Sequence, residues 1–591
     1  MKLKELSTLL HSALPIMGSA IKRGQLFKPH CTLTPPDPDI LCEYNVEVPI
    51  SEGFNVTVSI FRSKKTAQSG EKVPVVMCAH PYDCNKTPAL KNTPLGGPPQ
   101  QYRMIPQCGG TPEFSTLTSW EAPDPNFWVN AGYAVVNMNM PGFATSEGQP
   151  TVFSQHQGKC FYEAIEWIAK QPWCTGKVGL TGVSFLAISQ YYVAAGGEYD
   201  GPPPSLKCIS PWEGVSDPYR DVIMNGGIKE IGFPTFWWHT EVKDTINGTE
   251  QDFIKSEGGL PLEWTDIYPF MNDHWQAKIP KLEDITLPML VGASFSDHSL
   301  HTMGTCRAFE KAQSKHKWLY THRTGKWVSY YSQEVMNLTK EFMDCFLKDE
   351  DNGFKDKPAV RLEVRESRDT IKEVRHENEW PLARTQYTPM YFLKMQHHKI
   401  QNFTYAKSSI KNQHEYKAKK GELKIQHTFS EDTELSGYFK LKLWVETQAL
   451  DSKKSAEDDM EIFSVLHKLN TRGEVVHFNG SVGLNKDGVS RGCIKVSRRE
   501  LIENESKPWL PVLSGKSENK LKKGEIVPVE ISLNPSSTFF KAGESLQMVI
   551  SAQEIIPTPP FKKELNCQTG KHIIHFGGEY DSHLLIPIVP R

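Results

Sequence analysis

The stretch KVGLTGVSFLAISQYYVAA, residues 177–195, decides the fold. Its first half predicts a buried strand and its second half a helix, with Ser184 at the turn between them. Such a turn exposes a serine hydroxyl at the carboxyl edge of a parallel sheet, where the next helix offers backbone N–H groups to an oxyanion. Gly182 supplies the small residue before the serine, but Leu186 replaces the glycine that often follows two places later. Ser184 is therefore a candidate nucleophile, and an ordinary turn serine is the alternative.

The segments around this turn predict an α/β fold followed by a β-rich region. Apolar strands such as VPVVMCAH and AGYAVVNMNM alternate with amphipathic helices such as CFYEAIEWIAKQPW, as expected of a mostly parallel sheet covered on both faces. We assign residues 1–40 to an N-terminal extension and 41–350 to an α/β-hydrolase catalytic domain. The aromatic stretch 214–280 reads as an inserted helical cap. Residues 351–591 carry short strands and turns, which predict a jelly-roll β-sandwich.

The bulk composition restricts the class of function. A chain of 591 residues with a net charge of −2 lacks the basic excess of a nucleic-acid-binding protein. Its apolar runs are shorter than the roughly 20 residues of a membrane span. The 12 cysteines form no CxxC or zinc pattern, which favours reduced thiols and a cytoplasmic protein. We therefore expect no nucleic-acid or membrane partner and no metal or other cofactor, and we allow for a homodimer.

A serine nucleophile needs a base, and the base needs an orienting carboxylate. In sheet-based hydrolases these groups follow in the order serine, acid, histidine, each just after a strand. The strand LPMLVGASF is followed by Asp297, and the strand KWLYT is followed by His322. His298 and His301 also follow the acid, but we expect them in the next helix, packed or on the surface. The sequence therefore predicts Asp297 as the acid and His322 as the base.

The oxyanion requires hydrogen-bond donors at the same edge. The strand VPVVMCAH delivers Tyr82 to it, so the phenol is a candidate donor together with the backbone N–H of Phe185. A tyrosine packed under a loop is the alternative on this segment alone.

Taken together, these motifs resemble the cocaine-esterase/NonD group of α/β-hydrolases, relatives of the X-prolyl dipeptidyl peptidases. The resemblance runs from about residue 45 to the C-terminus and rests on HPYD, GKVGLTGVSFLA, SPWEGVSDPYRD, SFSDHSLHTMGT, KWLYTHRTGKW and RGCIKVSRREL. In that group the second glycine stands three places after the serine, where this chain has Ala187, and Pro141 replaces an arginine. The resemblance implies nucleophile Ser184, acid Asp297, base His322, and oxyanion donors Tyr82 and the Phe185 N–H.

The leading hypothesis is a metal-independent serine hydrolase that cleaves a small-molecule ester, lactone or amide through an acyl-enzyme. The aromatic cap indicates a bulky apolar substrate, and the expected pocket residues are Trp212, Phe236, Trp237 and Trp238, with Trp380 or Trp444 from the sandwich as a further wall.

Two other functions stay open. An X-prolyl dipeptidyl peptidase needs an anionic anchor for the substrate amine, for which Glu213 and Asp217 are candidates. A non-hydrolytic acyltransferase, cyclase or binding protein on the same fold is the other.

Overall fold

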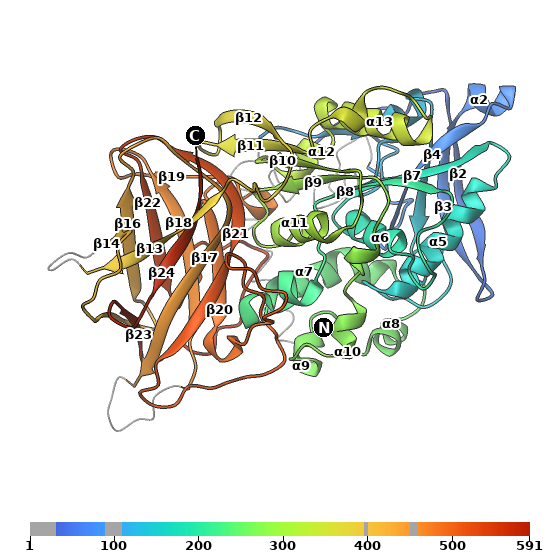
Figure 1. The fold of residues 1–591 in the computed structure, drawn as a ribbon. Coiled ribbons are helices and arrows are strands. Elements are labelled where there is room, and N and C mark those ends of the chain that lie inside the picture. Colours follow the sequence, from blue (N-terminus) through green and yellow to red (C-terminus); the bar gives the residue numbers. More distant parts are fainter. Residues whose placement is uncertain (1–30, 89–108, 395–399, 450–457, 591) are drawn as a thin grey trace.

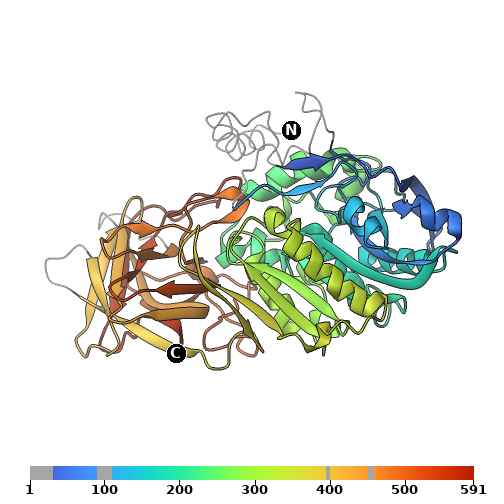
Figure 2. The same cartoon turned by 90° about the horizontal axis from the view of Figure 1, so that it is seen from above.

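The computed structural model describes residues 31–88, 109–394, 400–449 and 458–590. Residues 1–30 of the N-terminal extension assigned to 1–40 lie outside the described residues. The chain builds an α/β part and, beside it, a part made mainly of strands from the C-terminal third (Figures 1 and 2). None of the helices within the described ranges is long and apolar enough to cross a membrane. The cysteines of these ranges are free thiols, and nearly all of them are buried.

A twisted mixed sheet forms the centre of the α/β part. Its order is β2–β3–β6–β4–β7–β8–β9–β10–β11–β12, and the run from β6 to β11 is parallel. The strands are β2 (Ile40–Ile50), β3 (Phe54–Ser63), β4 (Val73–His80), β6 (Ala134–Asn139), β7 (Cys174–Val183), β8 (Leu206–Trp212), β9 (Met289–Ser294), β10 (Lys317–His322), β11 (Val360–Arg365) and β12 (Ile371–Glu377). A short pair, β1 (Thr32–Thr34) with β5 (Glu113–Ser115), lies apart from it.

Both faces of this sheet are covered, which explains why its strands are apolar throughout. Along β4, Val75 and Met77 belong to the core that contains helix residues such as Ile165, whereas Val76 belongs to the core that contains Phe342. This alternation follows from the two-residue period of a strand. The helices are α2 (Lys64–Ser69), α4 (Pro125–Asn130), α5 (Gln155–Ala169), α6 (Phe185–Ala194), α11 (Thr302–Lys311), α12 (Lys326–Tyr330) and α13 (Gln333–Leu347).

The aromatic stretch between β8 and β9 is helical. It holds α7 (Gly232–Trp237), α8 (Glu250–Glu257), α9 (Trp264–Ile267) and α10 (Asp273–Ala277), joined by short π and 3-10 turns. Its rings pack on one another: Trp264 meets Trp275 edge-on at 5.8 Å between ring centres, and Trp238 lies 4.7 Å from Phe253. Much of the aromatic density that the sequence shows here is therefore internal packing.

The C-terminal third is largely β, as the sequence predicts. One group of paired strands runs β15–β23–β17–β24–β13 with β21 also on β17, and the other runs β14–β16–β22–β18–β20 with β19 on β18. The pairing of β13 with β14 joins the two groups. The strands are β13 (Gln386–Leu393), β14 (Ile400–Thr404), β15 (Asn412–Lys417), β16 (Glu422–Thr428), β17 (Thr433–Gln448), β18 (Glu461–Leu469), β19 (Val475–Val476), β20 (Ser490–Lys495), β21 (Val527–Phe540), β22 (Ser545–Ser551), β23 (Lys571–Phe576) and β24 (His583–Val589).

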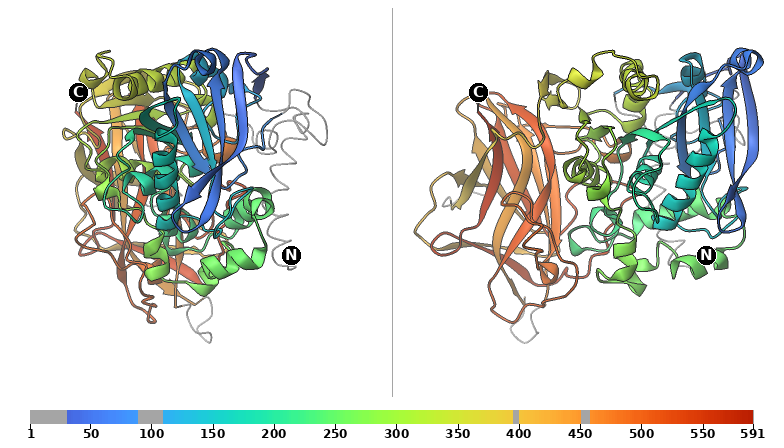
Figure 3. Two further views of the ribbon diagram at one scale, coloured as in Figure 1. Left: turned by 90° about the vertical axis from the view of Figure 1, so that its right-hand side faces the viewer. Right: turned by 45° about the vertical axis from the view of Figure 1, so that its right-hand side comes forward.

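Between these groups lies an apolar core of their alternate residues, among them Leu441, Leu443, Met548 and Ile550. Figure 3 shows these strands gathered beside the α/β part, away from β2 and α5. The segment AVRLEVRE is an exception to the sequence reading, because β11 continues the hydrolase sheet beside β10. It also meets the other C-terminal strands where Arg365 pairs with Thr538 of β21.

Arg365, the last residue of β11, ties the two parts together from a fully buried position. Its guanidinium donates hydrogen bonds to the Phe295 carbonyl at 2.8 Å, to the Ser536 hydroxyl at 2.6 Å and to the Val489 carbonyl at 3.2 Å. Burial lowers the pKa of Arg365 to about 9. The arginine therefore fixes the chain just after β9, two residues before Asp297, to strands of the C-terminal part.

We expect Arg365→Met to lower the free energy of unfolding by roughly 3 kcal/mol, because it leaves several buried acceptors without a donor. Urea denaturation of the full chain measures this loss. Arg472→Met is the matched control, since the Arg472 side chain is 77% exposed, and it should shift stability by less than about 0.5 kcal/mol. Equal stability of the two variants would contradict a linking role for Arg365.

Candidate active site

Ser184 stands in a strained turn between β7 and α6, as the sequence predicts. Its φ is 60° and its ψ is −116°, a conformation that residues with a side chain rarely adopt. The Ser184 N–H donates to the carbonyl of Trp212 at the end of β8, at 3.0 Å. Gly182 is required for close packing, because a Cβ there would lie 2.5 Å from the Cβ of Leu186. The turn thus has the geometry of a nucleophile elbow.

The small residue at position 187 has a structural reason as well. The chain at Gly214 passes so close to α6 that a Cβ on Gly214 would lie 3.2 Å from the Cβ of Ala187 and 2.9 Å from the ring of Tyr191. Because Gly214 leaves this space free, the methyl group of Ala187 fits at a position where the family that the sequence resembles has glycine.

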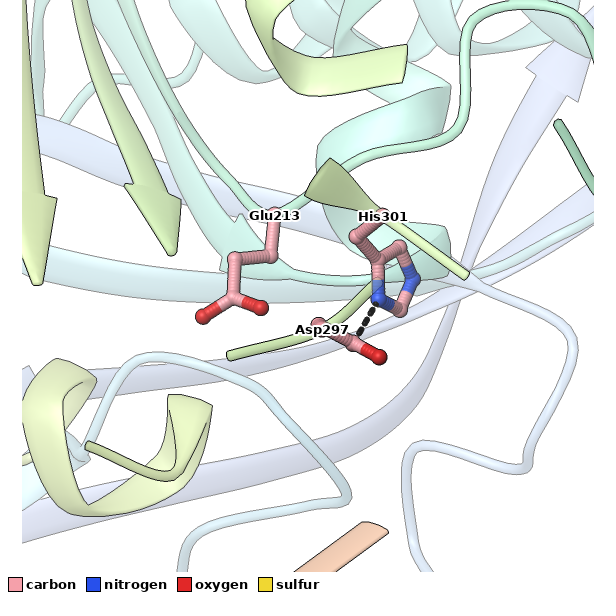
Figure 4. Close-up of side chains that lie close together, drawn as sticks. All are labelled: Glu213, Asp297 and His301. Carbon is pink, nitrogen blue, oxygen red and sulfur yellow. Dashed lines mark hydrogen bonds and ion pairs between the residues drawn. The ribbon is translucent and has the colours of Figure 1, made fainter. Parts of the chain in front are cut away.

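The histidine that contacts Ser184 is His301. Its Nε2 lies 3.1 Å from the Ser184 Oγ, and its Nδ1 lies 2.6 Å from Oδ2 of Asp297. Figure 4 shows the imidazole and the Asp297 carboxylate facing one another. Asp297 follows β9, as predicted, and the turn that begins there places His301 four residues later, directly before α11. Side chains four residues apart in a helical turn lie on the same side.

The prediction that His322 contacts Ser184 is therefore wrong. His322 is the last residue of β10, and its Nε2 lies 2.9 Å from Oε1 of Glu213, while its ring stacks on Trp212. The error came from requiring the base to follow a strand of its own, which a base in the same turn as the acid does not need to do. The spacing D-x-x-x-H at Asp297 and His301 was the signal in the sequence that could have identified it.

Burial and charge set the protonation of the two partners. Burial lowers the pKa of the His301 imidazole, and the nearby Lys326 ammonium lowers it further, while Asp297 opposes both. Burial by itself would raise the pKa of Asp297, but the charge and hydrogen bond of His301 bring it below its usual value. At neutral pH the pair is therefore a carboxylate and a neutral imidazole, the state in which an imidazole accepts a proton.

Tyr82 and the first turn of α6 lie at the same cavity as Ser184. The Tyr82 hydroxyl accepts a hydrogen bond from Nε1 of Trp237 at 3.0 Å, which leaves its own hydrogen to donate. Burial raises the pKa of Tyr82 well above its usual value, and the charges of Glu241 and Glu121 add to this. The phenol thus stays protonated and able to donate, and Phe185 opens the helix with its N–H at the elbow.

The cavity at Ser184 encloses about 860 Å³, counting space open to solvent, and is mostly apolar. Of the predicted pocket residues, Phe236 and Trp237 line it. Trp212 and Trp238 do not, because their rings pack elsewhere, Trp212 against His322 and Trp238 against Phe253. Aromatic neighbours that the sequence reading missed are Trp120, Phe153, Phe233, Trp264 and Trp327.

The residues that the C-terminal part contributes to the wall of the cavity also differ from the prediction. Val482 and Pro560 line the cavity. Trp380 instead packs between Phe295 and Tyr438, and Trp444 bonds through its indole N–H to Asp581 at 2.7 Å.

Among the described residues, three charged side chains line this cavity, namely Glu121, Glu241 and Lys326. The Lys326 ammonium lies 3.6 Å from Glu121, whose carboxylate also accepts from Nε1 of Trp327 at 2.8 Å. Burial raises the pKa of Glu121 to about 7, although Lys326 and Trp327 act against it. These residues come from separate elements, since Glu121 precedes α4, Glu241 lies in the π-helical turn after α7 and Lys326 begins α12. Nothing in the sequence indicates that they meet at one cavity.

The two predicted amine anchors lie elsewhere. Asp217 is bridged to Arg220 at 2.6 Å, and Glu213 is buried beside His322. Neither residue lines the cavity at Ser184.

One carboxylate oxygen each of Glu213 and Asp297 and one ring nitrogen of His301 lie within 4.8 Å of one another. Figure 4 shows the three side chains close together. Metal ligands also cluster in this way. Here, however, both ring nitrogens of His301 already have partners, Asp297 on one side and Ser184 on the other. A cation could bind only by breaking those hydrogen bonds, so the group as it stands does not suit a metal.

Comparison with known proteins identifies the family of the chain. A family model described as X-Pro dipeptidyl-peptidase (S15 family) matches residues 52–327. A second, described as the X-Pro dipeptidyl-peptidase C-terminal non-catalytic domain, matches residues 352–585. A curated relative, the cocaine esterase of Rhodococcus sp., is 25% identical over 398 residues, which are 59% of this chain and 61% of that protein. The chain thus matches about three-fifths of that relative's length.

Solved structures extend the comparison to nearly the whole chain. An α-amino acid ester hydrolase, 15% identical with a TM-score of 0.63 over 93% of this chain and 97% of that one, shows the same fold. A CocE/NonD family hydrolase from Staphylococcus aureus is 33% identical, with a TM-score of 0.81 over 96% of this chain and 100% of that one. The chain therefore belongs to the CocE/NonD family of hydrolases, which is related to the X-prolyl dipeptidyl peptidases.

Proposed function

We propose that this protein is a serine hydrolase that cleaves an ester, lactone or amide through an acyl-enzyme, with Ser184 as nucleophile, His301 as base and Asp297 as acid. The observation that carries the proposal is the continuous hydrogen-bonded row from Ser184 Oγ to His301 at 3.1 Å and from His301 to Asp297 at 2.6 Å. Asp297 holds the imidazole with its Nε2 free to accept the serine proton.

The steps follow from these contacts. The Ser184 Oγ attacks the substrate carbonyl carbon while its proton passes to Nε2 of His301. Collapse of the tetrahedral intermediate breaks the bond to the alcohol or amine, which leaves with that proton. Water then attacks the acyl-enzyme, again giving its proton to His301, and the carboxylic acid and free Ser184 are released.

The negative charge of the intermediate needs donors already in place. We infer that the Phe185 N–H and the Tyr82 hydroxyl provide them. In support, Tyr82 lines the cavity with Ser184, and the indole of Trp237 fixes its oxygen while leaving its proton free. The aromatic lining supports a bulky apolar group on the substrate, because a polar group placed there would lose its hydration without replacement.

A second function has a specific observation in its favour. An X-prolyl dipeptidyl peptidase requires a carboxylate near the nucleophile for the substrate ammonium, and Glu121 and Glu241 line the cavity that contains Ser184. They replace the anchors Glu213 and Asp217 that the sequence suggested. Because Lys326 lies beside Glu121 and partly neutralises it, we keep the esterase as the leading proposal.

We further infer the domain organisation. Residues 41–350 would form the catalytic domain, with 214–280 as a cap over its site. The segment 351–591 would add β11 and β12 to the catalytic sheet, and its later strands would form a jelly-roll sandwich. In support, cap residues Phe236 and Trp237 line the cavity, and two groups of strands enclose a common core in the C-terminal third.

We expect Ser184→Ala and His301→Gln each to lower kcat by at least about 10⁴-fold, because each removes a partner of the proton transfer. Ester hydrolysis and labelling by a fluorophosphonate probe measure the loss. His322→Gln should cost no more than about 10²-fold, since His322 does not contact Ser184.

His298→Gln is the matched control. His298 is buried three residues before His301 but faces Asp487, so the variant should keep at least about a tenth of the activity. Near-normal turnover by Ser184→Ala would refute the nucleophile, and inactivity of His322→Gln with activity of His301→Gln would return the role of base to His322.

For Tyr82→Phe we expect kcat to fall by about 10²–10³-fold with little change in KM, because the lost donor acts on the intermediate more than on bound substrate. Steady-state kinetics with a nitrophenyl ester measure both constants. Trp237→Phe, which keeps the ring and removes only the indole donor to Tyr82, should cost less. An unchanged kcat in Tyr82→Phe would leave the oxyanion to backbone donors alone.

A paired assay separates the two candidate substrate classes. We expect turnover of a short-chain nitrophenyl ester and far slower release from a Gly-Pro nitroanilide, because Lys326 weakens the site for an ammonium. Preferential cleavage of the Gly-Pro amide, lost in Glu121→Gln, would establish the peptidase instead.

A further inference from the structure

Glu213 is a buried carboxylate directly behind the proposed active site. It follows β8, and its side chain is 1% exposed. Its backbone is held at a φ of 52°, and its N–H donates to the carbonyl of Gly292 at 2.8 Å. The preceding residue, Trp212, accepts the N–H of Ser184. Because Glu213 does not line the cavity, a role in binding substrate does not explain why a charge is buried here.

The surroundings of Glu213 hold its carboxylate in one place. The Ser294 hydroxyl donates to Oε2 at 2.9 Å, and Nε2 of His322 lies 2.9 Å from Oε1, close but not aligned as a hydrogen bond. The His322 ring is fixed in turn by stacking on Trp212, with 5.5 Å between centres and 17° between planes. An unsupported buried carboxylate would be costly, so these contacts maintain Glu213 at this position.

On its other side Glu213 approaches the pair that serves Ser184. Atoms of Glu213, Asp297 and His301 lie within 4.8 Å of one another, and Figure 4 shows Glu213 beside that pair. At this distance, inside a protein, one charge has a large effect on another. His301 therefore has two carboxylates near it, and Lys326 as the opposing cation.

The charges around His301 determine in which direction Glu213 changes the pKa of its imidazole. Burial and Lys326 disfavour the imidazolium and lower the pKa of His301, whereas Asp297 and Glu213 favour it. Glu213 itself faces His322, and the charge of Glu121 also acts on it at longer range. Removal of the Glu213 charge thus leaves Lys326 opposed by Asp297 alone.

We propose that Glu213, held by His322 and Ser294, is a positioning residue that acts through His301 by stabilising the imidazolium formed when His301 takes the Ser184 proton. The inference rests on the proposed function. It gives a role to the contact between His322 and Glu213, which the roles of Ser184, His301 and Asp297 do not explain. It also gives Lys326 an opposing influence on the same base.

The test is the pH profile of kcat/KM for Glu213→Gln with a neutral nitrophenyl ester. The acid limb reports protonation of the base, so loss of the negative charge should move that limb to lower pH, by about one unit. The plateau of kcat should fall about tenfold or more while KM changes less than about threefold. A limb that stays in place or moves to higher pH would overturn the proposal.

Two further variants exclude a purely structural effect. Glu461→Gln is the control, because Glu461 is equally buried and hydrogen-bonded, to the backbone of Asn566 and Cys567 in the C-terminal part. It should lower the melting temperature without moving the limb. Should Glu213→Gln fail to fold, the double variant Glu213→Gln/His322→Gln removes both members of the pair and must show the same shift to lower pH.

Ser184→Ala separates this inference from the proposed function. Loss of hydrolysis in Ser184→Ala with an unmoved limb in Glu213→Gln refutes only the role of Glu213. Retained hydrolysis in Ser184→Ala refutes the mechanism itself.

Discussion

The site depends on a backbone constraint at Ser184. Its φ of 60° is strained for a residue with a side chain, and the surrounding chain must hold it there. Two neighbouring segments hold this turn by backbone hydrogen bonds. The Ser184 N–H donates to the Trp212 carbonyl, and the Val183 N–H donates to the Glu121 carbonyl at 3.2 Å. Both segments also carry buried carboxylates, so the contacts that maintain the turn bring Glu121 and Glu213 to the site.

The sheet and two members of the site could be predicted from the sequence because they depend on short-range patterns. Apolar runs of strand length fixed β4, β7 and β9, and parallel strands end at a common edge, which placed Ser184 and Asp297 together. The proposed base, His301, could not be found by the same rule. His301 reaches Ser184 through a turn whose position relative to β9 is set by tertiary contacts, including those of Arg365 with Phe295.

The cavity was harder to predict than the fold for a related reason. Composition identified an aromatic segment but not which rings face inward, and Trp212 and Trp238 are used in packing whereas Trp237 lines the cavity. Glu121 precedes α4 and Lys326 begins α12, so the two are far apart in sequence and meet only in the folded chain. An unusual backbone position such as Glu121, with a φ of 61°, leaves no recognisable pattern in the sequence.

The turn that holds Asp297 and His301 has a consequence for how such a site can diverge. When acid and base lie on different loops, a change in either loop disturbs their alignment. Here Asp297 and His301 lie four residues apart in a single turn, so a shift of that turn displaces both together. The segment after β10 therefore does not need to carry the proposed base, and its helix α12 supplies Lys326 and Trp327 to the cavity instead. On the proposed function, residues of that segment other than Lys326 could therefore change the cavity wall without changing the contacts of His301 with Ser184 and Asp297.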